Sequence, residues 1–180
     1  ITWMPGPIAG MFFYLYLIVD IFSRKIVGWE VHERESADLA AVLIRQAVLA
    51  EGCTLRPLVL HADNGSPPLV ICRQITAGQR MKGATMKTTM EKLGITASYS
   101  RPRVSNDNPF SEAHFKTLKY QPEFPKRFQT IEEARAFCRR FFAWYNEDHH
   151  HAGLGRMTPH PIHIGQADAI HAARQTALDA

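Results

Sequence analysis

The sequence predicts an α/β domain in which helices flank a mixed β-sheet. Apolar runs rich in β-branched and aromatic residues alternate with segments of helical spacing, in the order three strands, helix, strand, helix, strand, helix. This order contains five strands and suits a layered architecture. With 180 residues and 46% hydrophobic content, the chain is long enough to bury one core.

The first three strands are expected close together. Residues 1–3 form the end of a strand, and residues 4–10, with two Pro and two Gly, form a turn. Residues 11–21 are almost wholly apolar and aromatic, which is typical of a central strand buried on both faces. After a short polar turn, residues 26–31 complete a meander.

Helices and strands then alternate. Residues 36–51 form a helix that Ser36 caps and Gly52 ends, and residues 58–60 form a buried strand. A helix over residues 83–93 leads into the last strand, 95–100. Two further helices are expected, one beginning at a Thr130–Glu133 capping box and one over residues 166–180.

Residues 105–120, SNDNPFSEAHFKTLKY, form a helix with a polar start. Asn108 suits the N-cap and Pro109 the first turn, where its missing N–H costs nothing. Phe115 and Leu118 are expected to anchor the helix to the core.

One side of this helix carries charge. Glu112, Lys116 and Lys119 stand at i, i+4 and i+7, so they share one face. A solvated helix face with an ion pair between Glu112 and Lys116 explains the same pattern. The second interpretation is a site in which the carboxylate holds a divalent metal and the lysines hold phosphate.

The stretch LVLHADNGS, residues 58–66, supports the second interpretation. Asp63 and Asn64 follow the carboxyl end of a strand, where open α/β sheets place their chemistry. Asp63 also suits a purely structural role as the cap of the Asn64–Gly65 turn. Two carboxylates, Asp63 and Glu112, nevertheless supply ligands of the kind that hard cations prefer.

Three separated segments, HADNGS, SRPRVSNDNPFSEAHFKTLKY and FFAWYNEDHHHAGLGRMTP, resemble the catalytic core of DDE-type insertion-element transposases related to retroviral integrases. The similarity extends over residues 1–164. It implies a ribonuclease-H-like fold and a polynucleotidyl transferase that cleaves DNA and transfers strands. It also implies two Mg²⁺ or Mn²⁺ ions held by Asp, Asp and Glu, with Asp63 as the second Asp and Glu112 as the Glu.

The position of the first Asp follows from the same resemblance. In the family this Asp immediately precedes the strand that matches residues 1–3, so we expect it just before residue 1. The chain itself is then expected to contain two of the three carboxylates. Asp20 is the alternative, because it ends an apolar run. We expect Asp20 instead to brace the turn near Ser23 and Arg24.

The resemblance also implies contacts with DNA, both element ends and target. Lys116 and Lys119 match residues that position the DNA end, and Asn64 is a weaker candidate for orienting substrate. Arg101 and Arg103 lie in the loop before the catalytic helix and are candidates for phosphate contacts. Family members act as oligomers, so a homo-oligomer is expected. We expect the protein to be located in the bacterial cytoplasm and to associate with the nucleoid when it binds DNA.

One feature departs from the family. Between Asp63 and Glu112 lie 48 residues, positions 64 to 111, where relatives have about 35. Removing residues 68–80, PLVICRQITAGQR, restores the family spacing. This piece shows no clean period, and we expect an inserted surface loop near the site. Its effect on activity is left open.

Composition limits other functions. The net charge of +4 permits nucleic acid as a partner without requiring it. No apolar run reaches membrane-spanning length, and no signal peptide is visible. The three cysteines are far apart without metal-ligand spacing, so we expect reduced thiols and no structural zinc. They are Cys53, Cys72 and Cys138.

The histidines near the C-terminus raise a metal hypothesis. Residues 149–151 are three consecutive histidines, and His160 and His163 follow. Consecutive histidines rarely converge on one ion, so a loop between helices is the favoured interpretation. We expect residues 1–164 to form the catalytic core and residues 165–180 a helical extension.

Two other function classes remain open. One is a ribonuclease-H-like nuclease that hydrolyses nucleic acid without strand transfer. The other is a catalytically incomplete or decayed DNA-binding remnant, which the missing first Asp and the insertion favour.

Overall fold

The computed structural model describes residues 1–54, 57–62, 69–71, 75–76, 84–99 and 109–179. Strands β1 (Thr2–Pro5), β2 (Phe12–Val19) and β3 (Ile26–His32) come first, followed by helix α1 (Ala37–Ala50). The middle of the chain holds β4 (Leu58–Ala62), β5 (Leu69–Ile71), β6 (Ile75–Thr76), α2 (Ala84–Lys92) and β7 (Ile95–Tyr99). The last part is helical, with α3 (Pro109–Lys119), α4 (Ile131–Glu147), a 3₁₀ turn (Ala152–Leu154), α5 (Pro159–His163) and α6 (Ala167–Leu178).

The α/β prediction is confirmed, but the described strands form two hydrogen-bonded sheets rather than one sheet of five. β1, β2 and β3 form an antiparallel sheet with β2 in the centre. β4 and β7 pair in parallel in a second sheet, which β5 and β6 complete. The five expected strands are all present. Two strands of the insertion pair with β4, β5 in the antiparallel and β6 in the parallel direction.

The expectation of a plain loop at residues 68–80 was therefore wrong. Leu69–Ile71 and Ile75–Thr76 pair with each other as antiparallel strands as well as with β4. The segment LVIC contains the β-branched and apolar residues that suit a short strand, although it is too short to show a period.

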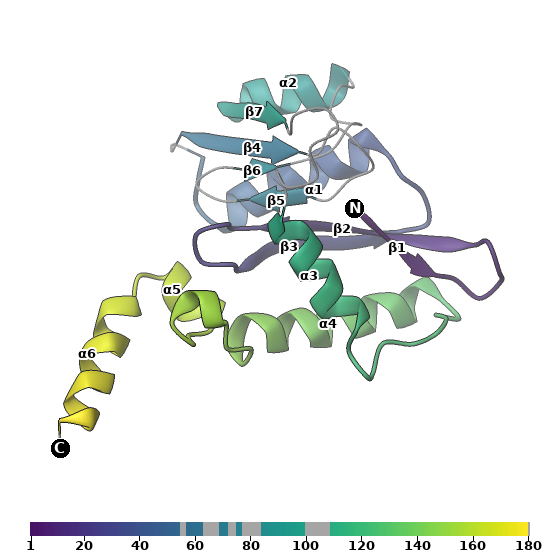
Figure 1. Ribbon diagram of the computed structural model, residues 1–180. Helices are drawn as coiled ribbons and strands as arrows, with labels where there is room; N and C mark the ends of the chain where they lie inside the picture. Colours follow the sequence, from purple (N-terminus) through teal and green to yellow (C-terminus); the bar gives the residue numbers. More distant parts are fainter. Residues whose placement is uncertain (55–56, 63–68, 72–74, 77–83, 100–108, 180) are drawn as a thin grey trace.

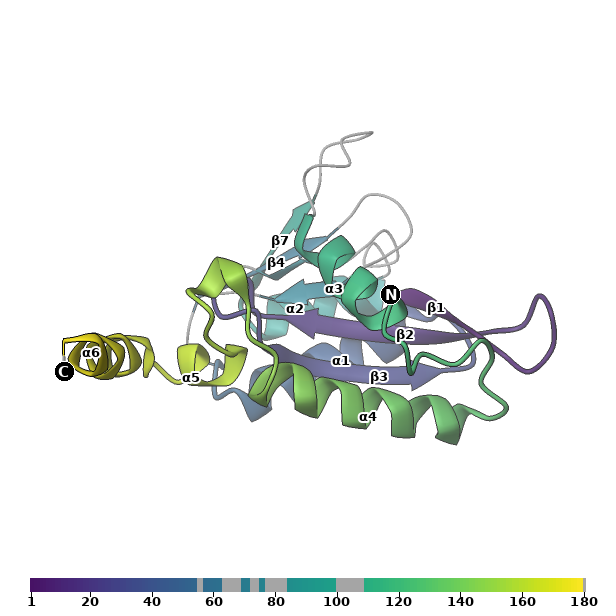
Figure 2. The ribbon, with the colours of Figure 1, turned by 60° about the horizontal axis from the view of Figure 1, so that its bottom comes forward.

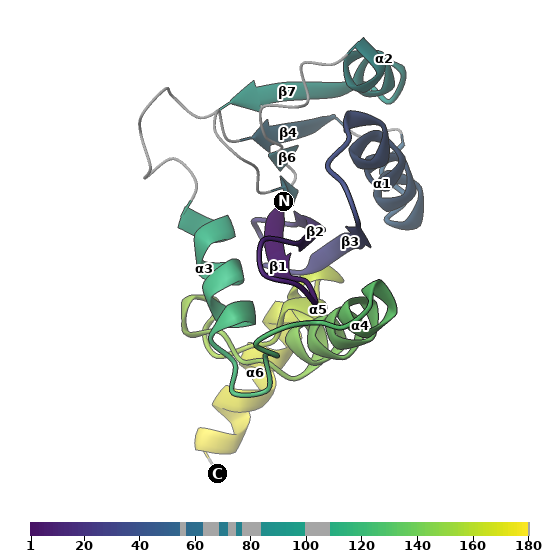
Figure 3. The ribbon, with the colours of Figure 1, turned by 90° about the vertical axis from the view of Figure 1, so that its right-hand side faces the viewer.

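β2 is the centre of the molecule, and its side chains alternate between two cores. Tyr16 and Ile18 are buried with α1, α2, β4 and β7. Leu15 and Leu17 are buried on the other face with α3 and α4. α1 and α4 therefore lie on opposite sides of the three-stranded sheet (Figure 3), and Figure 2 shows α4 running beside β3.

The predicted ends of α1 and the predicted start of α4 are confirmed, whereas Asn108, the predicted N-cap of α3, lies outside the described residues. The Ser36 hydroxyl accepts a hydrogen bond from the Asp38 amide, and Gly52 adopts φ 62° after α1. At α4 the Glu133 amide donates to the Thr130 hydroxyl, and the Glu133 carboxylate accepts from the Gln129 amide.

α6 projects from the body of the molecule (Figure 1). None of its described side chains is buried. Its contacts with the preceding loop include the Arg174 guanidinium, which donates to the carbonyls of Gly155 and Arg156. Within the described part of the chain, no helix combines the length and apolar character needed to cross a bilayer.

Candidate active site

The candidate site begins where the four-stranded sheet ends. β4 and β7 pair in parallel from Leu58↔Ile95 to Ala62↔Tyr99, so both strands end at the same edge. The His61 ring nitrogen Nδ1 lies 3.0 Å from the Ser98 hydroxyl one pair before that edge. Asp63 follows Ala62, the last residue of β4, directly in the sequence.

Several predicted site residues lie outside the described part of the chain. These are Asp63 and Asn64 after β4, and Arg101 and Arg103 after β7. Cys72, in the insertion, lies outside it as well. Their assignments remain predictions from the sequence.

α3 carries the other half of the predicted site. Glu112 lies in the first turn of this helix, and Lys116 and Lys119 are exposed further along it. Leu118 is fully buried and Phe115 packs against the same core, so their predicted role as anchors is confirmed. By helical spacing, position 112 lies on the side of α3 that the two lysines occupy.

The backbone brings the start of α3 near the end of β4. α3 contacts β5, and β5 pairs with β4 through Leu69↔Ala62, beside the last residue of β4. Figures 1 and 3 both show α3 running from the four-stranded sheet toward α4. The helix that contains Glu112 therefore reaches the strand next to β4, which precedes Asp63 in the sequence.

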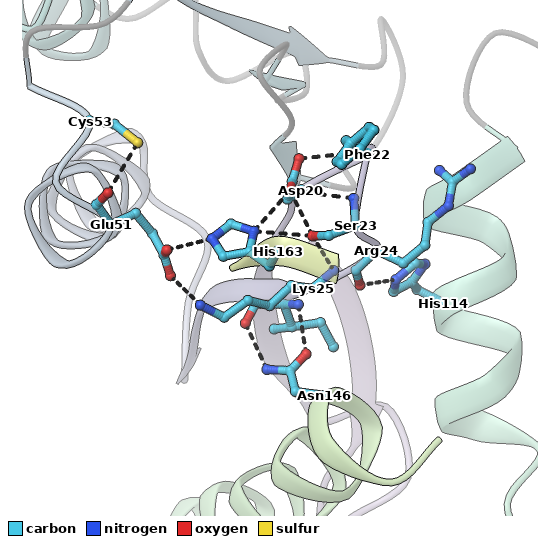
Figure 4. A network of polar contacts seen from close by, with 11 residues as sticks. Asp20, Phe22, Ser23, Arg24, Lys25, Glu51, Cys53, His114, Asn146 and His163 are labelled. Atoms are coloured by element: carbon cyan, nitrogen blue, oxygen red, sulfur yellow. Dashed lines mark hydrogen bonds and ion pairs between the residues drawn. The ribbon is translucent and has the colours of Figure 1, made fainter. Parts of the chain in front are cut away.

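Asp20 braces the β2–β3 turn, as expected. Its carboxylate accepts hydrogen bonds from the Ser23 hydroxyl at 2.6 Å and from the backbone amides of Phe22 and Ser23. The backbone closes the turn with Arg24 N–H donating to the Asp20 carbonyl at 2.7 Å. The Asp20 carboxylate is thus held by donors of this turn (Figure 4).

His163 on α5 is an ion-pair partner of this turn, which the sequence did not reveal. Its Nδ1 lies 2.9 Å from the Asp20 carboxylate, and its Nε2 lies 2.7 Å from the Glu51 carboxylate (Figure 4). Lys25 completes the cluster with its Nζ 2.8 Å from Glu51. Because both ring nitrogens face carboxylates, the imidazolium form is favoured.

The charged groups in this cluster shift one another's pKa values. Hydrogen bonds from His163 to Asp20 and Glu51 raise the pKa of His163 to about 9, although burial acts in the opposite direction. Burial acts to raise the pKa of Asp20 and of Glu51, but hydrogen bonds from His163, with those from Ser23 and Lys25, lower both pKa values overall. The cluster therefore joins α1, α5 and the β2–β3 turn electrostatically.

Two histidines of the 149–151 run pack against α4. His149 and His151 lie with ring centroids 4.5 Å apart, and both contact the Tyr145 ring. Burial, together with the neighbouring His149, lowers the pKa of His151 to about 4, so that side chain is neutral at pH 7. Among the residues that the structure describes, no three His, Cys, Asp or Glu side chains are grouped as metal ligands.

Comparisons with known proteins define the family. Two models described as integrase core domain match residues 1–105 and 93–159. The chain belongs to the integrase core domain family.

The curated relatives are insertion-sequence transposases. The transposase for insertion sequence element IS904 of Lactococcus lactis subsp. lactis is 31% identical over 147 residues, covering 81% of this chain and 53% of the relative. The transposase InsF for insertion sequence IS3A of Escherichia coli is 24% identical, covering 81% and 46%. The chain thus spans about half the length of these relatives.

A solved structure supports the fold. The simian T-cell lymphotropic virus intasome, in complex with PP2A regulatory subunit B56 gamma, contains a chain that matches 91% of this one with a TM-score of 0.60. That match covers 51% of the viral chain at 15% identity. The ribonuclease-H-like fold expected from the sequence is consistent with this likeness.

Proposed function

We propose that this chain is the catalytic core of a transposase that cuts DNA at element ends and transfers the freed strand to target DNA, in a metal-dependent reaction. The supporting observation is that the elements next to two separate family motifs lie close together. β4, which precedes Asp63 in the sequence, pairs with β5, and β5 contacts α3, the helix that contains Glu112.

The residues fit two Mg²⁺ or Mn²⁺ ions by their chemistry. Asp63 and Glu112 supply carboxylate oxygens, which these hard cations prefer, and a third carboxylate is proposed just before residue 1. Ions held there would supply stabilisation of the attacking and leaving oxygens of an in-line displacement at phosphorus. Asp20 is not included, because its oxygens already accept from Ser23, His163 and two backbone amides.

The protein side chains hold the DNA. Lys116 and Lys119 are exposed on α3 beyond Glu112 and contact phosphate near the scissile bond. Arg101, Arg103 and Asn64 are proposed as further contacts with DNA. The protein is proposed to work as a homo-oligomer on paired ends, in the bacterial cytoplasm and on the nucleoid.

A strand-transfer assay with a pre-cut, labelled DNA end and plasmid target tests this function. The full chain is used, with any flanking sequence that its gene encodes, in Mn²⁺ and in EDTA. Joined products that need the metal support the proposal. Hydrolysis without joining indicates the nuclease, and DNA binding without either reaction indicates the decayed remnant.

The lysine contacts are tested by salt dependence. Lys116→Ala and Lys119→Ala each remove one phosphate contact, so each is expected to weaken binding to any DNA sequence. Each is also expected to reduce the slope of log affinity against log salt by about 1. Fluorescence anisotropy from low to moderate salt measures both effects.

The matched control is Lys87→Ala, since Lys87 is an exposed lysine on α2 paired only loosely with Glu91 at 3.9 Å. An equal loss of affinity in the Lys87 variant would show that the α3 lysines act merely through net charge.

Deletion of residues 68–80 is expected to increase strand transfer about tenfold, because misplacing reacting groups by about 1 Å costs a factor of this size or more. The insertion contributes β5 and β6, which occupy an edge of β4 beside the three-stranded sheet. Without them, β4 is proposed to join that sheet in the single five-stranded sheet of the family. The rate of strand transfer by the deleted chain measures the effect.

Hydrogen exchange at the amides of Leu58–Ala62 in the deleted chain tests whether β4 is still paired in a sheet, because amides in a paired strand stay protected from exchange. Loss of both protection and activity on deletion would mean that the hairpin is a necessary part of this fold.

A further inference from the structure

Among the side chains of α3 that the structure describes, the buried polar one is His114. His114 is only 6% exposed, on the side of the helix that also carries the buried Leu118. Its ring nitrogen Nε2 lies 2.7 Å from the Tyr145 hydroxyl on α4 and 3.4 Å from the Arg24 carbonyl in the β2–β3 turn. The side chain therefore joins α3 to two other elements.

The position of Tyr145, the partner of His114 on α4, is fixed by its surroundings. It is almost completely buried in the middle of the second core, and its ring packs against His114, His149 and His151. Burial raises the pKa of Tyr145, so its hydroxyl stays protonated and able to share a hydrogen bond with His114. A hydrogen bond of 2.7 Å in such a site is both directional and shielded from water.

The turn that supplies the second partner is equally well held. Arg24 adopts φ 64°, a conformation that non-glycine residues adopt rarely and that surrounding structure must maintain. Asp20 maintains it through the Ser23 hydroxyl, and the Arg24 amide donates to the Asp20 carbonyl. Figure 4 shows His114 reaching the Arg24 carbonyl at the far end of this network from His163.

Apolar contacts alone fix a helix poorly. Leu118 and Phe115 favour burial, but hydrophobic contact is non-directional and tolerates small rotations and slides of α3. A hydrogen bond at His114 restricts both the rotation and the sliding of α3, because its length and angle change when the helix moves. Position 112 is two residues earlier, about 3 Å along the axis, so any movement of α3 is passed directly to Glu112.

We infer that His114 is a positioning residue, which fixes the rotation and height of α3 through its contacts with Tyr145 and the Arg24 carbonyl and so places Glu112 at the active site. This inference rests on the proposed function, in which Glu112 is a metal ligand. His114 does not itself touch DNA or metal.

The test compares three variants in the strand-transfer assay, using the full chain with any flanking sequence that its gene encodes. His114→Leu keeps the bulk and loses the hydrogen bond, and Tyr145→Phe removes only the partner hydroxyl. His114→Gln restores a side-chain amide that reaches the position of Nε2. The rate constant at saturating DNA and the half-saturating DNA concentration are measured separately.

His114→Leu and Tyr145→Phe are each expected to lower the rate constant about tenfold, with the half-saturating DNA concentration unchanged. The double variant is expected to be no slower than His114→Leu, because both changes remove one interaction. His114→Gln is expected to stay within about twofold of wild type. Cys138→Ala serves as the matched control, because it leaves a cavity beside Met4 in the same core and keeps the hydrogen bond between His114 and Tyr145. It is expected to lower the melting temperature without lowering the rate.

The outcomes separate the two proposals. If Glu112→Gln is inactive while Tyr145→Phe and His114→Leu react at the wild-type rate, the positioning role is wrong and the proposed function stands. Equal losses in His114→Gln and His114→Leu would also overturn the positioning role. If Glu112→Gln is itself fully active, the proposed function is wrong. Should His114→Leu fail to fold, Tyr145→Phe and His114→Gln still decide the result.

Discussion

Replacing Glu112 by Gln is expected to lower the rate of strand transfer at least about 10³-fold, since loss of a metal-ligand charge removes several kcal/mol of transition-state stabilisation. The substitution keeps the size and helix propensity of the side chain and changes only its charge. α3 should therefore form as before, with Leu118 in the core. The measurement is the initial rate of joining of a labelled pre-cut end in Mn²⁺.

Glu123→Gln is the matched control, because Glu123 is an exposed carboxylate in the turn after α3. It is expected to react at the wild-type rate. DNA binding by Glu112→Gln should be unchanged or slightly tighter, since a negative charge has been removed near phosphate. A Glu112→Gln variant with near-normal joining would place the third carboxylate elsewhere.

His163→Ala is expected to destabilise the fold by about 2 kcal/mol at pH 6, because it leaves two partly buried carboxylates without their shared cation. Lys25 still pairs with Glu51, which limits the loss. For a chain of this length the melting temperature should fall by about 4–8 °C, measured by circular dichroism. His160→Ala on the same short helix is the control, because the His160 ring lies 3.5 Å from Glu147 at a more exposed position.

The pH dependence of this effect has a definite sign. The folded-state pKa of His163 is raised to about 9, so its contribution is complete below the unfolded value of 6.5 and is lost as pH rises through about 9. The pKa values of Asp20 and Glu51 are lowered, so their contributions are present above the ordinary carboxyl values and are lost as pH falls. The cluster is thus strongest at weakly acidic pH.

The difference in stability between wild type and His163→Ala should therefore shrink when the pH is raised from 6 to 10. A difference that stays constant over this range would show that His163 contributes through packing alone.

Local signals in the sequence were sufficient for most of the elements. Ser36 and Thr130 cap helices as predicted, Gly52 and Gly94 end them with positive φ, and the apolar run at residues 11–21 contains the central strand. These features depend on neighbouring residues, which periodicity and capping rules describe well.

Contacts between distant residues were not predictable in the same way. His163 and Asp20 are 143 positions apart, and His114 and Tyr145 are 31 apart. A histidine among six near the C-terminus carries no local sign of its ion pair. A histidine on an amphipathic helix shows only that it lies on the buried side. That second signal, His114 four residues before Leu118, was available and was missed.

The prediction of a single five-stranded sheet was wrong for a related reason. The spacing between Asp63 and Glu112 indicated the insertion correctly, but strand pairing of so short a segment depends on the edge of β4 that receives it. The turn-bracing role of Asp20, by contrast, was correctly predicted, because its partners Phe22, Ser23 and Arg24 are neighbours in sequence.

Mn²⁺ binding measured by calorimetry tests the central claim most directly, comparing the full chain and any flanking sequence that its gene encodes with its Asp63→Asn, Glu112→Gln and Asp20→Asn variants. The proposed site predicts that binding is lost in the first two variants and kept in Asp20→Asn, whose effect is confined to the stability of the β2–β3 turn. Loss of binding in a folded Asp20→Asn variant, or its persistence in both Asp63→Asn and Glu112→Gln, would contradict the assignment.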